Sequence, residues 1–124
     1  MNKFPKSERL HSTKLIEELF EEGTSFTVYP LRVVYLKKPL QSQETHQVLV
    51  TIPKKRFKRA VDRNKMKRRI KEAYRLHKQV LKSEMQKFYL LIGYIYVGRD
   101  IASYQEVEEK LKESLLRLKE IVDS

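Results

Sequence analysis

The sequence of 124 residues contains no cysteine and no tryptophan. The lack of cysteine excludes a disulfide scaffold, a thiolate metal site and a cysteine nucleophile. No long apolar run stands near the N-terminus, so we expect neither a signal peptide nor a membrane span, and we expect a cytoplasmic protein. Hydrophobic residues make up 40% of the chain, which favours a folded protein, and the length fits a single domain over residues 1–124.

Motifs for catalysis and metal binding are also lacking. His11, His46 and His77 lie far apart in the sequence, and there is no HExxH motif, no P-loop and no acidic cluster. His77 lies on the apolar side of a predicted helix, so we predict that it is a core residue. The sequence therefore predicts no catalytic side chain and no metal site. We expect solvated surface at the glutamates on helix faces, which are Glu17, Glu18, Glu21, Glu22, Glu106, Glu108 and Glu109.

Positive charge is abundant but is confined to one segment. Lys and Arg total 27 against 16 Asp and Glu, for a formal net charge of +11. Residues 54–78 hold 13 of these bases and only two acids, Asp62 and Glu72, whereas the rest of the chain holds 14 of each sign. A basic segment of this kind predicts a polyanionic partner.

Hydrophobic periodicity and turn residues predict an αβββαβα order. The predicted elements are a helix over 12–22, strands over 25–29, 31–37 and 47–52, a helix over 61–80, a strand over 88–97 and a last helix that begins at the capping box 103–106. The polar segment 38–46 is predicted to be a loop, and the apolar run 88–97 a strand buried on both faces. This order predicts an α+β two-layer sandwich with one mixed sheet. If strands 47–52 and 88–97 pair in parallel, the usual hand of the crossover is right-handed.

The predicted helix over 61–80 separates apolar and basic residues. On a helical wheel, Met66, Ile70 and Tyr74 share one side, while cations and Asn64 fill the opposite arc. Like charges three or four residues apart repel, so such a face loses stability unless a polyanion neutralises it. We therefore predict nucleic-acid binding in preference to a merely solvated face. The apolar side lacks an exposed Leu, Phe or Trp that would insert into lipid, which argues against a membrane partner.

The segment 60–75 carries a long motif: Arg63-Asn64-Lys65, then Met66-Lys67-Arg68, then Lys71-Glu72-Ala73-Tyr74-Arg75. It resembles the signature helix of the bacterial ribonuclease P protein subunit, whose pattern is Arg-Asn-Arg, Ile-Lys-Arg and Arg-Glu-x-[Phe/Tyr]-Arg. Segments 51–55, 19–23 and 103–106 also resemble the family, so the resemblance spans almost the whole chain. The departures are Lys65 in place of Arg, Leu49 in place of a strand glycine, Ile16 and Val34 at positions that are often aromatic, and Arg99 alone from an Ala-Arg-Lys sequence.

The resemblance implies the αβββαβα fold of a ribosomal protein domain, with a left-handed crossover instead of the usual one. It implies an RNA-binding subunit of an endoribonuclease, which assists a catalytic RNA in removing the 5′ leader from precursor tRNA. The RNA would use Mg²⁺ for hydrolysis, and this chain would carry no cofactor. The implied partners are the ribonuclease P RNA and precursor tRNA, not DNA and not a membrane. The alternative is a ribosomal or general RNA-binding structural protein with a similar sandwich.

The resemblance also implies two RNA-binding surfaces. The motif helix and the basic loop before it would contact the RNA subunit, through Lys54, Lys55, Arg59, Arg63, Asn64, Lys65, Lys67, Arg68, Arg69, Lys71 and Arg75. A cleft between the first helix and the sheet would hold the single-stranded leader, with Ile16, Phe20 and Val34 as candidate contacts. Core packing explains Phe20 equally well, since it ends the apolar side of the first helix.

Overall fold

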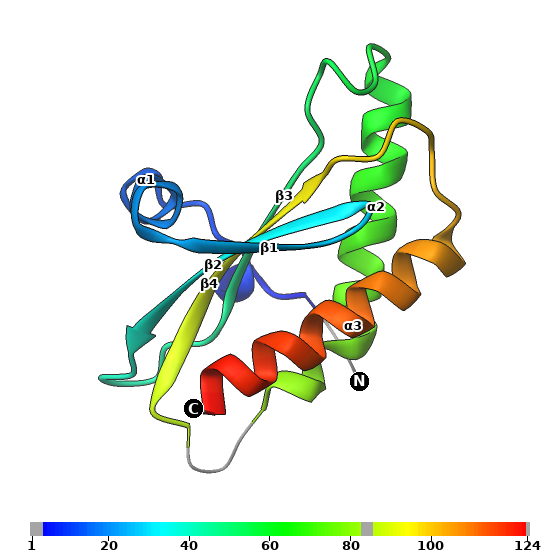
Figure 1. Cartoon of the computed structure of the whole chain (residues 1–124). Helices are drawn as coiled ribbons and strands as arrows, with labels where there is room; N and C mark the ends of the chain where they lie inside the picture. The colour runs from blue at the N-terminus through cyan, green and yellow to red at the C-terminus, as the bar shows by residue number, and fades with distance from the viewer. Residues whose placement is uncertain (1–3, 83–85, 124) are drawn as a thin grey trace.

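The computed structural model describes residues 4–82 and 86–123, and its element order confirms the predicted αβββαβα fold (Figure 1). The α-helices and strands follow in the chain as α1 Thr13–Glu22, β1 Thr24–Val28, β2 Leu31–Pro39, β3 Gln47–Thr51, α2 Ala60–His77, β4 Phe88–Tyr96 and α3 Tyr104–Asp123. Two short 3₁₀ turns, Lys6–Glu8 and Lys78–Leu81, precede α1 and follow α2. No helix in the described part of the chain is both long and apolar enough to cross a membrane.

The four strands form one mixed sheet in the order β1-β2-β4-β3. β2 is antiparallel to both β1 and β4, while β3 pairs with β4 in parallel. This parallel pair, connected through α2, confirms the predicted βαβ unit. The left-handed crossover that the family resemblance implies for this unit stays a prediction. β2 runs two residues past its predicted end because Lys38 and Pro39 pair with Tyr89 and Phe88 of β4.

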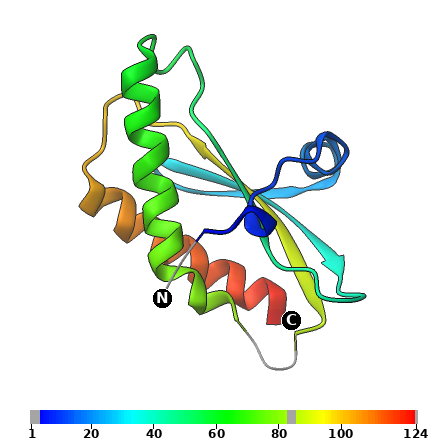
Figure 2. The same ribbon diagram turned by 180° about the vertical axis from the view of Figure 1, so that it is seen from behind.

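Helices cover both faces of the sheet. α2 and α3 pack on one face, and α1 lies over part of the other, as the two opposite ribbon views show (Figures 1 and 2). The alternating side chains of β4 fill both cores: Ile92 and Tyr94 face α2 and α3, while Leu91 faces α1. β4 is therefore buried on both faces, as predicted. The Tyr94 hydroxyl is satisfied within the core by Ser114 Oγ of α3, at 2.7 Å.

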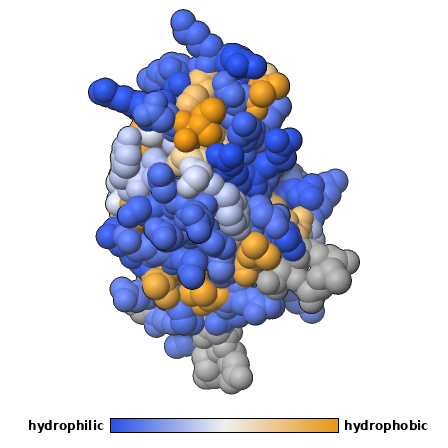
Figure 3. Space-filling view, turned by 90° about the vertical axis from the view of Figure 1, so that its right-hand side faces the viewer, coloured by the Kyte–Doolittle hydropathy of each residue, from blue (hydrophilic) through white to orange (hydrophobic). Residues whose placement is uncertain are grey.

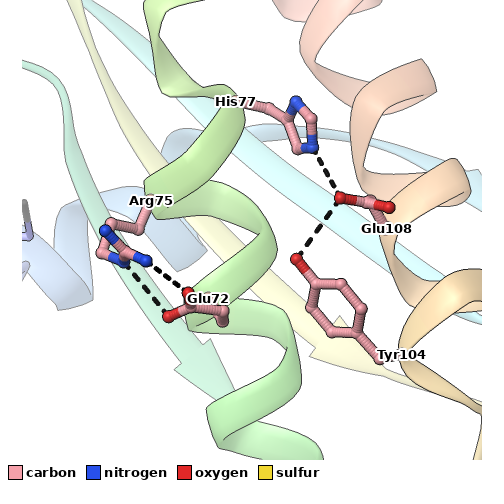
Figure 4. A network of polar contacts seen from close by, with 5 residues as sticks. All are labelled: Glu72, Arg75, His77, Tyr104 and Glu108. Carbon is pink, nitrogen blue, oxygen red and sulfur yellow. Dashed lines mark hydrogen bonds and ion pairs between the residues drawn. The ribbon is translucent and has the colours of Figure 1, made fainter. Parts of the chain in front are cut away.

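α2 lies on the sheet along the predicted apolar line. Met66, Ile70 and Tyr74 are buried, and the helix ends at His77, three residues before its predicted end. The prediction that His77 is a core residue is wrong. Its ring is half-buried, and Nε2 lies 2.8 Å from the Glu108 Oε2 of α3 (Figure 4).

Candidate nucleic-acid interface

The basic loop before α2 is held in place by an apolar anchor and an arginine. Phe57 is buried, and its ring lies against that of Tyr96, with centroids 5.6 Å apart. Arg63, in the first turns of α2, donates from Nη1 to the carbonyl oxygens of Phe57 and Lys58, both at 2.8 Å. The loop therefore has a defined shape, although its other cations point into solvent. Those exposed cations include the predicted contacts Lys54, Lys55 and Arg59.

The outer side of α2 continues this exposed basic surface. Asn64, Lys67 and Arg68 are exposed, and Lys65 and Lys71 are partly exposed beside them. We call these five residues the α2 face. The side of the molecule that carries α2 and the start of α3 is largely hydrophilic, with small hydrophobic areas (Figure 3). The structure thus gathers the cations as the helical wheel predicted.

Two further arginines of the motif already bind protein groups. Arg69 donates to the carbonyl oxygen of Ala102, in the loop before α3. Arg75 forms two hydrogen bonds to the carboxylate of Glu72, one turn earlier on α2 (Figure 4). The Glu72 carboxylate raises the pKa of Arg75, and the Arg75 guanidinium lowers the pKa of Glu72. The motif alone does not distinguish among its cations. In the structure, Arg69 and Arg75 differ from the cations of the α2 face because they are bound to other groups of the protein.

Burial and like charge both act on Lys71. Partial burial lowers the pKa of Lys71, and the positive charges of Lys67 and Arg9 lower it further. Arg9 lies 62 positions before Lys71, outside the basic segment. An anion bound beside Lys71 would relieve this repulsion.

A second candidate surface lies where α1 crosses the sheet. Phe20 is 46% exposed, and its Cζ lies 3.6 Å from the position that a Cβ on Gly93 would occupy. Gly93 pairs with Val34 on one side and with Leu49 on the other, and Leu49 is half-buried. The Phe20 ring therefore lies over the sheet while much of its surface faces solvent. We call Phe20, Ile16 and Leu49 the α1–sheet surface.

The three predicted leader contacts differ in how much of each side chain is exposed. Val34 is 5% exposed and belongs to the core beneath α1, so it leaves almost no surface for a ligand. Ile16 is half-buried against the same core. Tyr35 points to the opposite face, as its strand position predicted, where its ring contacts that of Phe26. Phe20 is therefore the only one of the three candidates that the structure leaves exposed.

Comparisons with known proteins identify the family of this chain. A family model described as Ribonuclease P matches residues 4–119. The chain belongs to the ribonuclease P family. It is 41% identical over 115 residues to the ribonuclease P protein component of Porphyromonas gingivalis, covering 91% of this chain and 84% of that one. The corresponding protein of Dictyoglomus turgidum is 32% identical over 115 residues, which cover 93% of this chain and 88% of that one.

A solved structure shares the fold. The ribonuclease P protein from Thermotoga maritima matches with a TM-score of 0.70 and 25% identity, covering 89% of this chain and 96% of that one. The resemblance read from the motif helix and its flanking segments is thereby confirmed at the level of the whole chain.

Several polar contacts of this ribonuclease P family member were missed at the sequence level. Glu18 forms an ion pair with Lys38 at 2.7 Å, and Glu108 binds both His77 and the Tyr104 hydroxyl (Figure 4). The prediction of solvated surface is therefore wrong for these two glutamates. The paired residues lie 20 and 31 positions apart in the chain. Local periodicity cannot indicate contacts at such separations, so these pairs become visible only in the folded structure.

Proposed function

We propose that this chain is the protein subunit of ribonuclease P, which assists a catalytic RNA in removing the 5′ leader from precursor tRNA. The observation that carries the proposal is the α2 face, whose four cations are exposed or partly exposed and continue the anchored basic loop. Family membership supports the same assignment. We assign the α2 face, Lys54, Lys55 and Arg59 to contacts with the RNA subunit.

The proposed role of the protein is electrostatic and positional. Each cation of the α2 face neutralises a phosphate and releases counterions, so RNA segments that repel one another can approach. Arg63 and Arg69 contribute differently, because their hydrogen bonds hold the basic loop and the loop before α3 at the two sides of α2. We assign hydrolysis, and the Mg²⁺ that supports it, to the RNA.

The α1–sheet surface is assigned to the leader. A single strand exposes the faces of its bases, and an aromatic ring can stack on any of them without selecting its identity. Phe20 offers such a ring over the backbone of Gly93. Binding of this kind suits leaders of different sequence.

Reconstitution tests the proposal. The chain is mixed with ribonuclease P RNA and precursor tRNA at low Mg²⁺, and cleavage at the 5′ end of the mature tRNA is followed. We expect the chain to stimulate cleavage only when the RNA subunit is present. If the chain binds RNA without stimulating this reaction, it is instead a structural RNA-binding protein of the kind found in ribosomes.

A further inference from the structure

The N-terminal segment brings one arginine to the junction between the two candidate surfaces. Leu10 donates its backbone N–H to the carbonyl oxygen of Val48 at 2.9 Å, so this segment runs along β3, an edge strand of the sheet. Phe4 packs on Tyr74 of the α2 core, with ring centroids 5.7 Å apart. Arg9 lies between these two anchors. Its Nη2 donates to the carbonyl oxygen of Phe4 at 3.1 Å, and its guanidinium stacks over the Phe4 ring.

Arg9 and two lysines of the α2 face line one small pocket of about 90 Å³. Its wall is completed by Phe4, Leu10 and the β3 residues Val48, Leu49 and Val50. None of the described lining residues is acidic. Within residues 4–82 and 86–123, neither Arg9 nor Lys67 nor Lys71 has a carboxylate partner.

Three cations line this pocket without a carboxylate, so an anion from outside the chain would relieve their repulsion. Their mutual repulsion is visible in the lowered pKa of Lys71, to which both Lys67 and Arg9 contribute. A phosphate oxygen fits this chemistry, because the Arg9 fork can donate two hydrogen bonds while the lysines supply point charges. The half-buried Leu49 of the β3 wall offers an apolar contact for the sugar next to that phosphate.

The position of the pocket indicates which phosphate it holds. Leu49 belongs both to the pocket wall and to the α1–sheet surface, while Lys67 and Lys71 belong to the α2 face. A strand that leaves the Phe20 ring and crosses the β3 edge toward α2 therefore meets this pocket. We propose that Arg9 binds one backbone phosphate of the precursor tRNA leader where it passes between the two surfaces, and that Lys67 and Lys71, besides their contacts with the RNA subunit, add positive charge to that site. This inference rests on the proposed function.

Substitution of Arg9 in the reconstituted holoenzyme tests the site. Arg9→Gln removes the charge and the fork, Arg9→Lys keeps the charge, and Arg117→Gln on the exposed side of α3 is the matched control. The affinities for precursor tRNA and for mature tRNA, which lacks the leader, are measured across a salt series. We expect Arg9→Gln to weaken precursor binding by about 10- to 150-fold, the usual value of one hydrogen bond to a charged group. Mature tRNA and the RNA subunit should bind as they do to the wild type.

The salt series provides a second readout. Loss of one phosphate contact to a single strand should reduce the slope of log affinity against log salt by about 0.7 for the precursor only. Arg9→Lys should keep the wild-type slope, and Arg117→Gln should change neither affinity nor slope. An unchanged ratio of precursor to mature affinity, or an equal loss for the RNA subunit, would overturn the assignment to the leader.

Neutral methylphosphonate linkages in the leader keep the test independent of protein folding. With wild-type protein, one neutral linkage should weaken binding far more than its neighbours, and Arg9→Gln should lose part of its sensitivity at that linkage only, because Lys67 and Lys71 remain there. Equal sensitivity of both proteins at every linkage would refute the site. If wild-type protein fails to stimulate cleavage at all, the proposed function fails, whereas normal cleavage with an insensitive leader refutes this inference alone.

Discussion

Replacement of Phe20 separates a ligand-binding ring from a core residue. Phe→Ala in a core costs about 3–5 kcal/mol, and complete burial of a Phe side chain is worth about 1.5–3 kcal/mol. Phe20 is 46% exposed, so only about half of that burial contributes, and Phe20→Ala should destabilise the fold by about 0.8–1.5 kcal/mol. The neighbouring Leu19 is fully buried, and Leu19→Ala should cost about 2–5 kcal/mol.

The affinity for precursor tRNA should depend more on the exposed Phe20 than on the buried Leu19, the reverse of their order in stability. A base stacked on an aromatic ring is worth about 1–3 kcal/mol, so Phe20→Ala should weaken precursor tRNA by about 5- to 150-fold relative to mature tRNA. Phe20→Leu is the matched variant, because it keeps apolar area but loses the flat face. Both variants are compared with the wild type in the holoenzyme at fixed salt, and their free energies of unfolding are measured in urea. A precursor-to-mature ratio equal to that of the wild type, with the fold intact, would refute the role of Phe20.

Three further predictions concern charge and chemistry. Replacing Lys67, Arg68 and Lys71 together by Ala should reduce the salt slope of RNA binding by roughly 2–3, and an unchanged slope would exclude the α2 face as a contact surface. The chain alone, incubated with precursor tRNA and Mg²⁺, should leave the RNA intact; specific 5′ cleavage that a point variant abolishes would contradict this. Because the hydrogen bond from His77 lowers the pKa of Glu108, that carboxylate stabilises the fold at neutral pH and loses this contribution as pH falls through the lowered pKa. Glu108→Gln should therefore be less stable than the wild type at neutral pH, with a difference that shrinks in acid, as thermal unfolding across pH would show.

The sequence predicted those features that depend on neighbours along the chain. The apolar line of α2 follows from a spacing of three and four residues, and its burial leaves the cations no other place than the outer side. The buried strand β4 follows from its uninterrupted apolar run. Even the capping residue of α3 was readable, since Ser103 Oγ accepts the N–H of Glu106.

Features that depend on distant contacts were not readable. Val34 and Phe20 are both apolar, and only the way α1 crosses the sheet over Gly93 decides which of them is buried. His77 lies on the apolar side of the wheel but meets Glu108, because α3 approaches the end of α2 there. The pocket that Arg9 shares with Lys67 and Lys71 has no local signal either, because the two lysines lie about 60 positions later in the chain.

The basic residues of the motif helix divide into two physical kinds, and this division decides how the interface works. Arg63 and Arg69 donate hydrogen bonds to backbone carbonyl oxygens of the loops that flank α2, and so hold these loops in place against the helix. Lys67 and Arg68 are exposed beside one another and keep their charges available. A helix with only the second kind would repel itself and leave its loops undefined, while a helix with only the first kind would bind RNA weakly. The motif therefore combines arginines that bind backbone carbonyls, as Arg63 and Arg69 do, with exposed cations that remain available for phosphates.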